Sequence, residues 1–185
     1  MSGSKLSVIR FGNPILRDVA LQLSDEEIAS EETKDFVQAL FARLLADDGV
    51  GLAAPQVGVS KALFVIAIHP NAYHPERENF RAVAINPGYE GIGRRISMWE
   101  GCLSSGDGRS VLFGKALRYK KIVAIYTDQD GVHHREELNG LLAHIFQHET
   151  DHLNGRLFVD LVRDPTSYMT GDEYRKRILG RGTTS

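Results

Sequence analysis

The chain has 185 residues, of which 42% are hydrophobic and 25% are charged, and its formal net charge is -2. This length fits one domain with its own core, and the composition is that of a globular protein rather than a disordered or fibrous one. The small net charge excludes a general electrostatic attraction to nucleic acid or anionic lipid, because such binding needs clustered Lys and Arg.

The first predicted element is an amphipathic helix over residues 24–48. Its start is acidic, it lacks Gly and Pro, and Phe36, Leu40 and Leu44 recur at helical spacing. Gly49 is expected to end this helix.

Three short runs rich in Val and Ile predict strands at residues 62–68, 82–85 and 122–126. Asp130-Gly131 lies after the last run and indicates a hairpin turn. None of the apolar runs approaches the roughly 20 residues that cross a bilayer, so we expect no membrane span.

A second helix is predicted over residues 138–154, with Asn139 as its N-cap and Gly155 at its C-terminal end. The order of helix, strands and helix indicates an α+β domain with antiparallel pairing. Residues 71–79 are expected to form a surface loop, and the tail over 175–185 is expected to fray.

We expect a single catalytic domain over residues 1–185, with a core over about 5–163 and a C-terminal extension over 164–185 that holds a short helix. Cys102 is the only cysteine, so no internal disulfide can form, and the first ten residues lack the apolar run of a secretory signal. A cytoplasmic location is therefore expected.

Residues 148–152 form an HExxH motif inside the second predicted helix. Helical positions four apart lie on one face, so His148 and His152 can bind one metal ion while Glu149 lies beside them. Chance occurrence is the alternative. His144 lies one turn earlier, but three histidines at this spacing span about 12 Å, which is too far for one ion. The motif favours the pair His148 and His152 and leaves His144 as a pocket-wall or hydrogen-bonding residue.

A catalytic metal of this kind usually has three protein ligands, so one ligand remains to be found. Cys102, in the segment EGCLS over residues 100–104, is the candidate, because a thiolate suits a borderline-soft metal. The alternatives are a buried inert thiol and a nucleophilic cysteine paired with a histidine. We favour ligation because HExxH already provides a means of activating water.

The segment GVGLAAPQ over residues 49–56 is rich in small residues, which allow close approach of the backbone to another group. It lacks the Lys-Ser/Thr ending of a phosphate-binding loop, so we interpret it as a tight turn against a site. Gln56 can donate a hydrogen bond to a developing oxyanion.

These three segments together resemble the three signature motifs of the peptide deformylases, in the same order and with similar separation. A looser similarity covers residues 9–17. The resemblance implies antiparallel strands packed around a central metal-binding helix, and removal of the formyl group from N-terminal formylmethionine of nascent polypeptides. It also implies a divalent metal held by Cys102, His148 and His152. The implied native metal is Fe(2+), with Zn(2+), Ni(2+) or Co(2+) as substitutes, whereas the ligand types alone would suggest zinc.

The resemblance implies a mechanism with one role for each residue. The metal lowers the pKa of a water molecule, and Glu149 accepts the proton before it passes one to the leaving amine. The oxyanion is stabilised by the metal, the backbone N–H of Leu103 and the side chain of Gln56.

Helical spacing places three residues near His148 as candidate walls of the methionine pocket, and the resemblance adds residues from the other two motifs and from the stretch around Cys102. These candidate substrate-binding residues are Val50, Gly51, Met98, Glu100, Gly101, Arg109, Leu141, His144 and Ile145.

The sequence departs from the family after EGCLS, where residues 105–108 replace the usual aliphatic residue and proline. We expect this segment to be more flexible and more polar, which affects peptide binding rather than the metal site. Arg109 keeps its spacing from Cys102 and can hold a substrate backbone carbonyl, or it can be a solvated surface charge.

Two other functions fit parts of the sequence: a non-catalytic relative that keeps the metal and binds peptide N-termini, and an HExxH peptidase that cleaves internal bonds. The basic residues 175–177 allow a transient contact with ribosomal RNA, although a solvated helix end is the simpler interpretation. No stable nucleic acid binding is expected.

Overall fold

The computed structural model describes residues 6–70, 74 and 78–180. Over these residues the strands form one sheet of six strands in the order β1-β2-β3-β4-β5, with β6 paired to β4. All of the strand pairs are antiparallel. The strands are β1 (Gly51–Ala53), β2 (Leu63–Ile68), β3 (Phe80–Gly101), β4 (Leu112–Thr127), β5 (His133–Asn139) and β6 (Met169–Thr170). The α-helices are α1 (Asp25–Ala29), α2 (Glu31–Ala46), α3 (Gly140–Leu153) and α4 (Gly171–Arg177).

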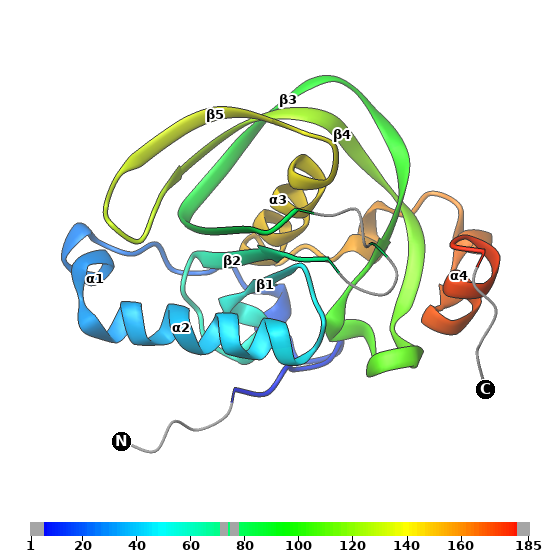
Figure 1. Cartoon of the computed structure of the whole chain (residues 1–185), viewed down its shortest axis with the longest axis horizontal. Helices are drawn as coiled ribbons and strands as arrows, with labels where there is room; N and C mark the ends of the chain where they lie inside the picture. The colour runs from blue at the N-terminus through cyan, green and yellow to red at the C-terminus, as the bar shows by residue number, and fades with distance from the viewer. Residues whose placement is uncertain (1–5, 71–73, 75–77, 181–185) are drawn as a thin grey trace.

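Helix α3 lies at the centre of the fold. Figure 1 shows it inside the curve formed by β3, β4 and β5, and it packs against β1, β2 and β4. Every residue from Ala143 to Leu153 is buried, including the polar ones. The predicted architecture, antiparallel strands around a central helix, is confirmed.

Strand β2 is buried on both faces, which explains its uninterrupted apolar sequence. Phe64 and Ile66 belong to the core on the side of α3, and Phe64 contacts Phe146 edge to face at 5.1 Å between ring centroids. Leu63 and Val65 belong to the core on the side of α2. The sheet therefore separates two apolar layers and presents α3 to only one of them.

The single helix predicted over 24–48 is wrong, because the chain forms two helices that meet at Ser30. The backbone of Ser30 is extended, and its hydroxyl accepts a hydrogen bond from the N–H of Thr33, which caps the start of α2. Helix α2 also ends differently from the prediction. Asp48 rather than Gly49 adopts the left-handed conformation, at φ 52°, and the N–H of Gly49 closes the end by donating to the carbonyl of Leu44.

The strands predicted at 82–85 and 122–126 are interior parts of much longer strands. Strand β3 has 22 residues and β4 has 16. The outer part of β3 is exposed to solvent, so no apolar run marks it in the sequence. The hairpin predicted at Asp130-Gly131 is confirmed, because it joins β4 to β5 and Gly131 has φ 80°.

The second predicted helix begins later than expected, at Gly140, since Leu138 and Asn139 are still paired in β5. Asn139 occupies the N-cap position, but its side chain makes no capping hydrogen bond. Gly155 has φ 66°, and a Cβ there would lie 2.3 Å from the carbonyl oxygen of Arg17, so a glycine is required after this helix.

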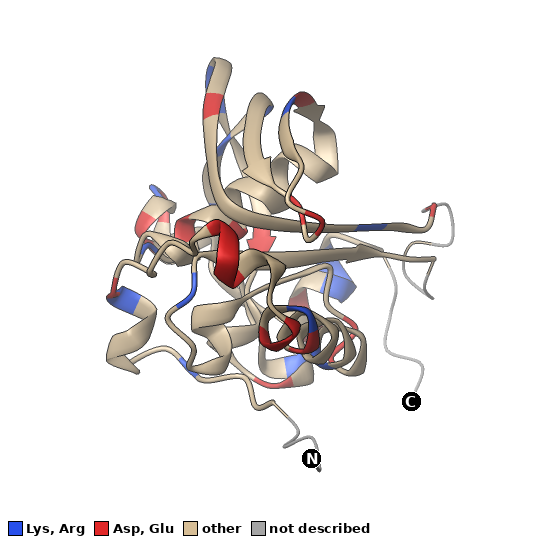
Figure 2. Ribbon diagram, turned by 90° about the vertical axis from the view of Figure 1, so that its left-hand side faces the viewer, with Lys and Arg blue, Asp and Glu red and all other residues tan. Residues whose placement is uncertain are grey.

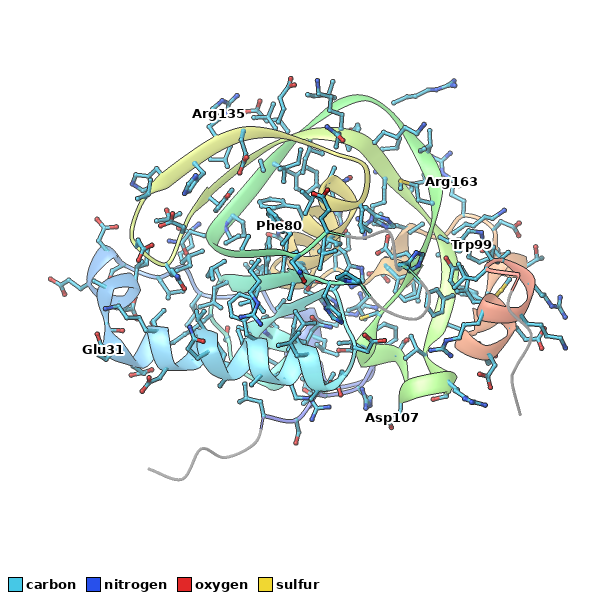
Figure 3. The ribbon with its side chains drawn as sticks, in the orientation of Figure 1. Glu31, Phe80, Trp99, Asp107, Arg135 and Arg163 are labelled. Carbon is cyan, nitrogen blue, oxygen red and sulfur yellow. The ribbon has the colours of Figure 1, made fainter. Side chains whose placement is uncertain are left out.

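The expected surface loop over 71–79 and the expected frayed tail fall largely or partly on residues 71–73, 75–77 and 181–185, which lie outside the described residues. The predicted C-terminal helix is present as α4. Its Tyr174 ring stacks on Phe113 of β4 at 4.1 Å, and Figure 3 shows Trp99 beside this helix.

None of the described helices is both long enough and apolar enough to cross a membrane. Figure 2 shows acidic and basic positions interspersed along the elements, in agreement with the small net charge.

Candidate active site

Three side chains with ligand atoms converge where β3 ends against the inner face of α3. Cys102 follows β3 directly, and His148 and His152 lie one turn apart on α3. Their ligand atoms all lie within 4.8 Å of one another, and the Sγ of Cys102 is 3.2 Å from Nε2 of His152. Among the described residues, Cys102, His148 and His152 form the group that could hold a metal ion. His144 is not part of this group.

The donor set fits a divalent transition metal. Nδ1 of His148 is hydrogen bonded to Glu100, which leaves the other ring nitrogen free for a ligand. The thiol of Cys102 is not in a disulfide. Two imidazoles and one thiolate suit zinc or iron, and three protein ligands leave a position open for water or substrate.

Glu149 is buried beside these ligands, and its Oε2 has no hydrogen-bond partner. Burial raises the pKa of the Glu149 carboxyl to about 7, with the nearby His148 acting in the opposite direction. A carboxyl group of this pKa can both accept and release a proton near neutral pH.

Gly51 of β1 makes room for this carboxylate. A Cβ at position 51 would lie 2.3 Å from Oε1 of Glu149 and 2.9 Å from Cγ2 of Ile145. The segment GVGLAAPQ was predicted to be a tight turn, but Gly51–Ala53 form strand β1 and Ala54–Val57 form a 3-10 helix. The predicted close approach to a site is present, and the group approached is the side chain of Glu149.

Gln56 lies on the opposite side of Cys102. Its Oε1 accepts a hydrogen bond from the N–H of Ala53 at 2.8 Å, which orients its amide nitrogen toward Ser104 Oγ at 3.3 Å and Cys102 Sγ at 3.6 Å. Leu103 directly follows Cys102, and its carbonyl accepts from Arg10 at 2.5 Å. The amide of Gln56 is thus positioned next to the candidate ligand Cys102, and Leu103 follows Cys102 in the chain.

Glu100 is the centre of a buried hydrogen-bond network. Arg118 of β4 donates to both of its oxygens, at 2.8 and 2.6 Å, and pairs with Asp151 of α3 through its remaining nitrogen. His148 donates to the same carboxylate at 2.5 Å, and His144 does so at 2.8 Å.

Burial would raise the pKa of Glu100, but His148 and Arg118 outweigh it and hold this pKa well below its usual range. Burial would lower the pKa of His148, but Glu100 outweighs it and raises this pKa well above its usual range. Burial and His148 together lower the pKa of His152. Glu100 therefore favours a proton on His148, whereas burial and the charge of His148 disfavour a proton on His152.

A sequence model of the family described as "Polypeptide deformylase" matches residues 5–167. The chain belongs to this family. The family predicted from the three motifs is confirmed.

Three related proteins agree with this assignment. Peptide deformylase 2 of Nostoc sp. is 36% identical over 180 residues, which cover 96% of this chain and 97% of that protein. A solved structure of the class I type b peptide deformylase from Acinetobacter baumannii with bound Met-Ala-Ser has a TM-score of 0.79 and 34% identity, and covers 88% of this chain and 100% of that one. The peptide deformylase of Synechococcus elongatus in complex with actinonin has a TM-score of 0.76 and 32% identity, with 90% and 84% covered.

The deformylase motifs did not reveal Arg118 or Asp151. Arg118 belongs to a run of basic and aromatic residues, Arg118-Tyr-Lys-Lys121, that is typical of an exposed strand. Its side chain is only 1% exposed. The one available signal was Asp151, an acidic residue on the helix that the resemblance places at the centre of the fold. A charge in such a buried place requires a partner of opposite charge.

The residues that were expected to bind the substrate differ in how deeply they are buried. Ile145 is buried next to Gly51, whereas Leu141 is 38% exposed. Val50 is partly buried against the core on the side of α3, while Met98 and Gly101 are partly exposed near the end of β3. Glu100 was expected to line the substrate pocket, but both of its oxygens are occupied by Arg118, His144 and His148.

The segment over residues 105–108, which was expected to be more flexible and more polar, is held by several hydrogen bonds. Ser105 Oγ donates to the carbonyl of Cys102 at 2.6 Å and accepts from the N–H of Leu112 at 2.9 Å. Asp107 forms an ion pair with Arg10. Arg109 has a side chain that is 72% exposed, and it forms an ion pair with Asp172 of α4 at 3.8 Å.

Proposed function

We propose that this chain is a metal-dependent peptide deformylase that removes the formyl group from N-terminal formylmethionine of nascent polypeptides and releases formate. The observation that carries the proposal is the convergence of Cys102, His148 and His152 beside the unpartnered Oε2 of Glu149. The A. baumannii relative binds Met-Ala-Ser, a peptide that begins with methionine.

In this proposal Cys102, His148 and His152 hold the metal, which when bound supplies the Lewis acidity that lowers the pKa of water and polarises a carbonyl group. Glu149 accepts the proton of the attacking water at Oε2. The water oxygen forms a bond to the formyl carbon, and the bond from that carbon to the methionine nitrogen breaks. Glu149 then gives its proton to the leaving amine, so that one water and one formamide yield formate and a free N-terminus.

Gln56 Nε2 and the N–H of Leu103 donate to the formyl oxygen as negative charge develops on it. Such donors act most strongly when they are fixed before the reaction, and the bond from Gln56 to Ala53 fixes the amide. We propose that Ile145, Gly51, Val50, Met98, Gly101, Leu141 and Arg109 line the path of the substrate.

We further propose that the native metal is Fe(2+), with Zn(2+), Ni(2+) or Co(2+) as functional or structural substitutes. A mixed thiolate and imidazole set accepts all four metals, so the choice of iron rests on the resemblance to the family and not on the ligands. We place the activity in the cytoplasm, where nascent chains emerge, with a transient ribosome contact through the basic last turn of α4 over residues 175–177.

Anaerobically purified, iron-loaded protein is expected to release formate from formyl-Met-Ala-Ser. Formate is measured with a coupled dehydrogenase assay, and the free amine is measured in parallel by a fluorogenic reagent. Equal amounts of the two products support the proposal. Absence of turnover despite bound metal would favour a non-catalytic relative, and cleavage of the Met-Ala bond would favour a peptidase.

Gly51→Ala is expected to lower kcat by about 10²-fold, because an added methyl group displaces the oxygen of Glu149 and a small misplacement of a catalytic group costs this much. Formate release under saturating substrate measures the effect. Gly88→Ala is the matched control, since a Cβ at that position of β3 meets nothing within 4 Å. Equal activity of the two variants would show that the space at Gly51 does not serve Glu149.

A further inference from the structure

His144 of α3 lies on the same helix face as the candidate ligands His148 and His152, and the proposed mechanism does not use it. It is buried, with 9% of its surface exposed, and its Nε2 lies 2.8 Å from Oε2 of Glu100. It lies one turn before His148, so both rings approach the same carboxylate from the same helix.

The chemistry of this carboxylate determines which atoms carry protons. Glu100 receives two hydrogen bonds from the Arg118 guanidinium, so it is the charged partner of a buried ion pair and can only accept. Nε2 of His144 and Nδ1 of His148 must therefore both donate to it. Donation from Nδ1 fixes the His148 ring so that its Nε2 is the nitrogen available to a metal.

Each oxygen of Glu100 has two donors, one from Arg118 and one from a histidine. Oε2 accepts from Arg118 Nε and His144, and Oε1 accepts from Arg118 Nη2 and His148. Without His144, Oε2 would keep one donor, and the carboxylate could turn toward Arg118 and away from His148. The loss of one hydrogen-bond donor from a buried acceptor costs free energy, and the acceptor tends to turn toward its remaining donors.

We propose that His144 is a positioning residue for the metal site, which holds the Glu100 carboxylate in the orientation that aligns His148 for coordination. This inference rests on the proposed function, because it assumes that His148 binds a metal. It assigns His144 to the support of the metal site rather than to the wall of the methionine pocket. The presence of a third histidine beside the two candidate ligands is then explained.

The test compares three variants with the wild-type protein. His144→Leu removes the donor and keeps an apolar side chain of similar bulk, whereas His144→Gln places an amide N–H near the position of Nε2. His133→Leu on the exposed side of β5 is the control for loss of a histidine elsewhere. The affinity of each apoprotein for Zn(2+) is measured by competition with a chromophoric chelator, and the visible absorption of each Co(2+) form reports the ligand geometry.

His144→Leu is expected to weaken Zn(2+) binding by about tenfold, the lower end of the range for loss of an outer partner of a ligand, and to change the Co(2+) spectrum. His144→Gln is expected to restore most of the affinity, and His133→Leu should match the wild type. Unchanged Zn(2+) affinity in His144→Leu, with a raised KM for formylmethionyl peptide, would overturn this inference and assign His144 to the pocket wall. Wild-type protein that binds no metal would overturn the proposed function as well.

Discussion

Glu149→Gln is expected to lower kcat for formate release by about 10²- to 10⁴-fold, the usual contribution of a positioned general base. The amide has nearly the same shape as the carboxylate but cannot accept a proton from water at neutral pH. Because Glu149 is not one of the three candidate ligands, the variant should still bind one metal per chain. Steady-state formate release and metal analysis of the same preparation measure both effects.

Glu26→Gln, on the exposed first turn of α1, is the matched control and should keep full activity. Turnover of Glu149→Gln close to that of the wild type would contradict the assignment of the base. Loss of both turnover and metal would instead show that Glu149 supports metal binding, and the mechanism would then need another proton acceptor.

Arg118→Met is expected to lower the free energy of unfolding by about 3–5 kcal/mol, because it leaves buried carboxylates without their cation. The side chain of Arg118 is 1% exposed and pairs with both Glu100 and Asp151, which are almost equally buried. Urea unfolding of the metal-free protein, followed by circular dichroism, measures the change without a contribution from metal binding.

Arg135→Met on the neighbouring strand β5 is the control for this substitution. Arg135 pairs with Glu90 at 2.9 Å, but both side chains are more than half exposed, and Figure 3 shows Arg135 at the outer edge of the sheet. An exposed pair contributes about 0–1 kcal/mol. Similar losses in the two variants would mean that burial of the Arg118 network adds no stability beyond that of a surface pair.

The predicted candidate ligands and base are local features of the sequence. HExxH brings His148, Glu149 and His152 onto one helix by helical periodicity alone, without any information from the rest of the fold. Cys102 required a further argument, since the number of ligands in a catalytic zinc site indicated that one was missing. The three motifs together also predicted the family, which the comparisons confirmed.

The bounds of some helices and strands were predicted incorrectly, because exposure to solvent or the hydrogen bond of a single side chain determines them. The helix breaks at Ser30 because the Ser30 hydroxyl caps the start of α2. A serine within a continuous helix would instead point its hydroxyl to solvent, and the sequence pattern is compatible with either arrangement. The outer parts of β3 and β4 are held by pairing with each other. The outer part of β3 is exposed, and the outer part of β4 buries Gly114, Ala116 and Arg118 rather than large apolar residues. Only the short stretches rich in Val and Ile were therefore visible in the sequence.

The sequence by itself determined the family, through three motifs in a fixed order, and the class of fold, through the order of helix and strands. The residue types in those motifs also gave the candidate side chains for the chemistry. Only the tertiary structure decided the surroundings of those side chains. Arg118 comes from β4, Glu100 from β3, and His144 and Asp151 from α3, so their meeting depends on how the sheet curves around the helix. An isolated charge is unstable in that buried space, so these residues pair with one another. The sequence pattern had instead indicated an exposed position for Arg118 and a substrate pocket for Glu100 and His144.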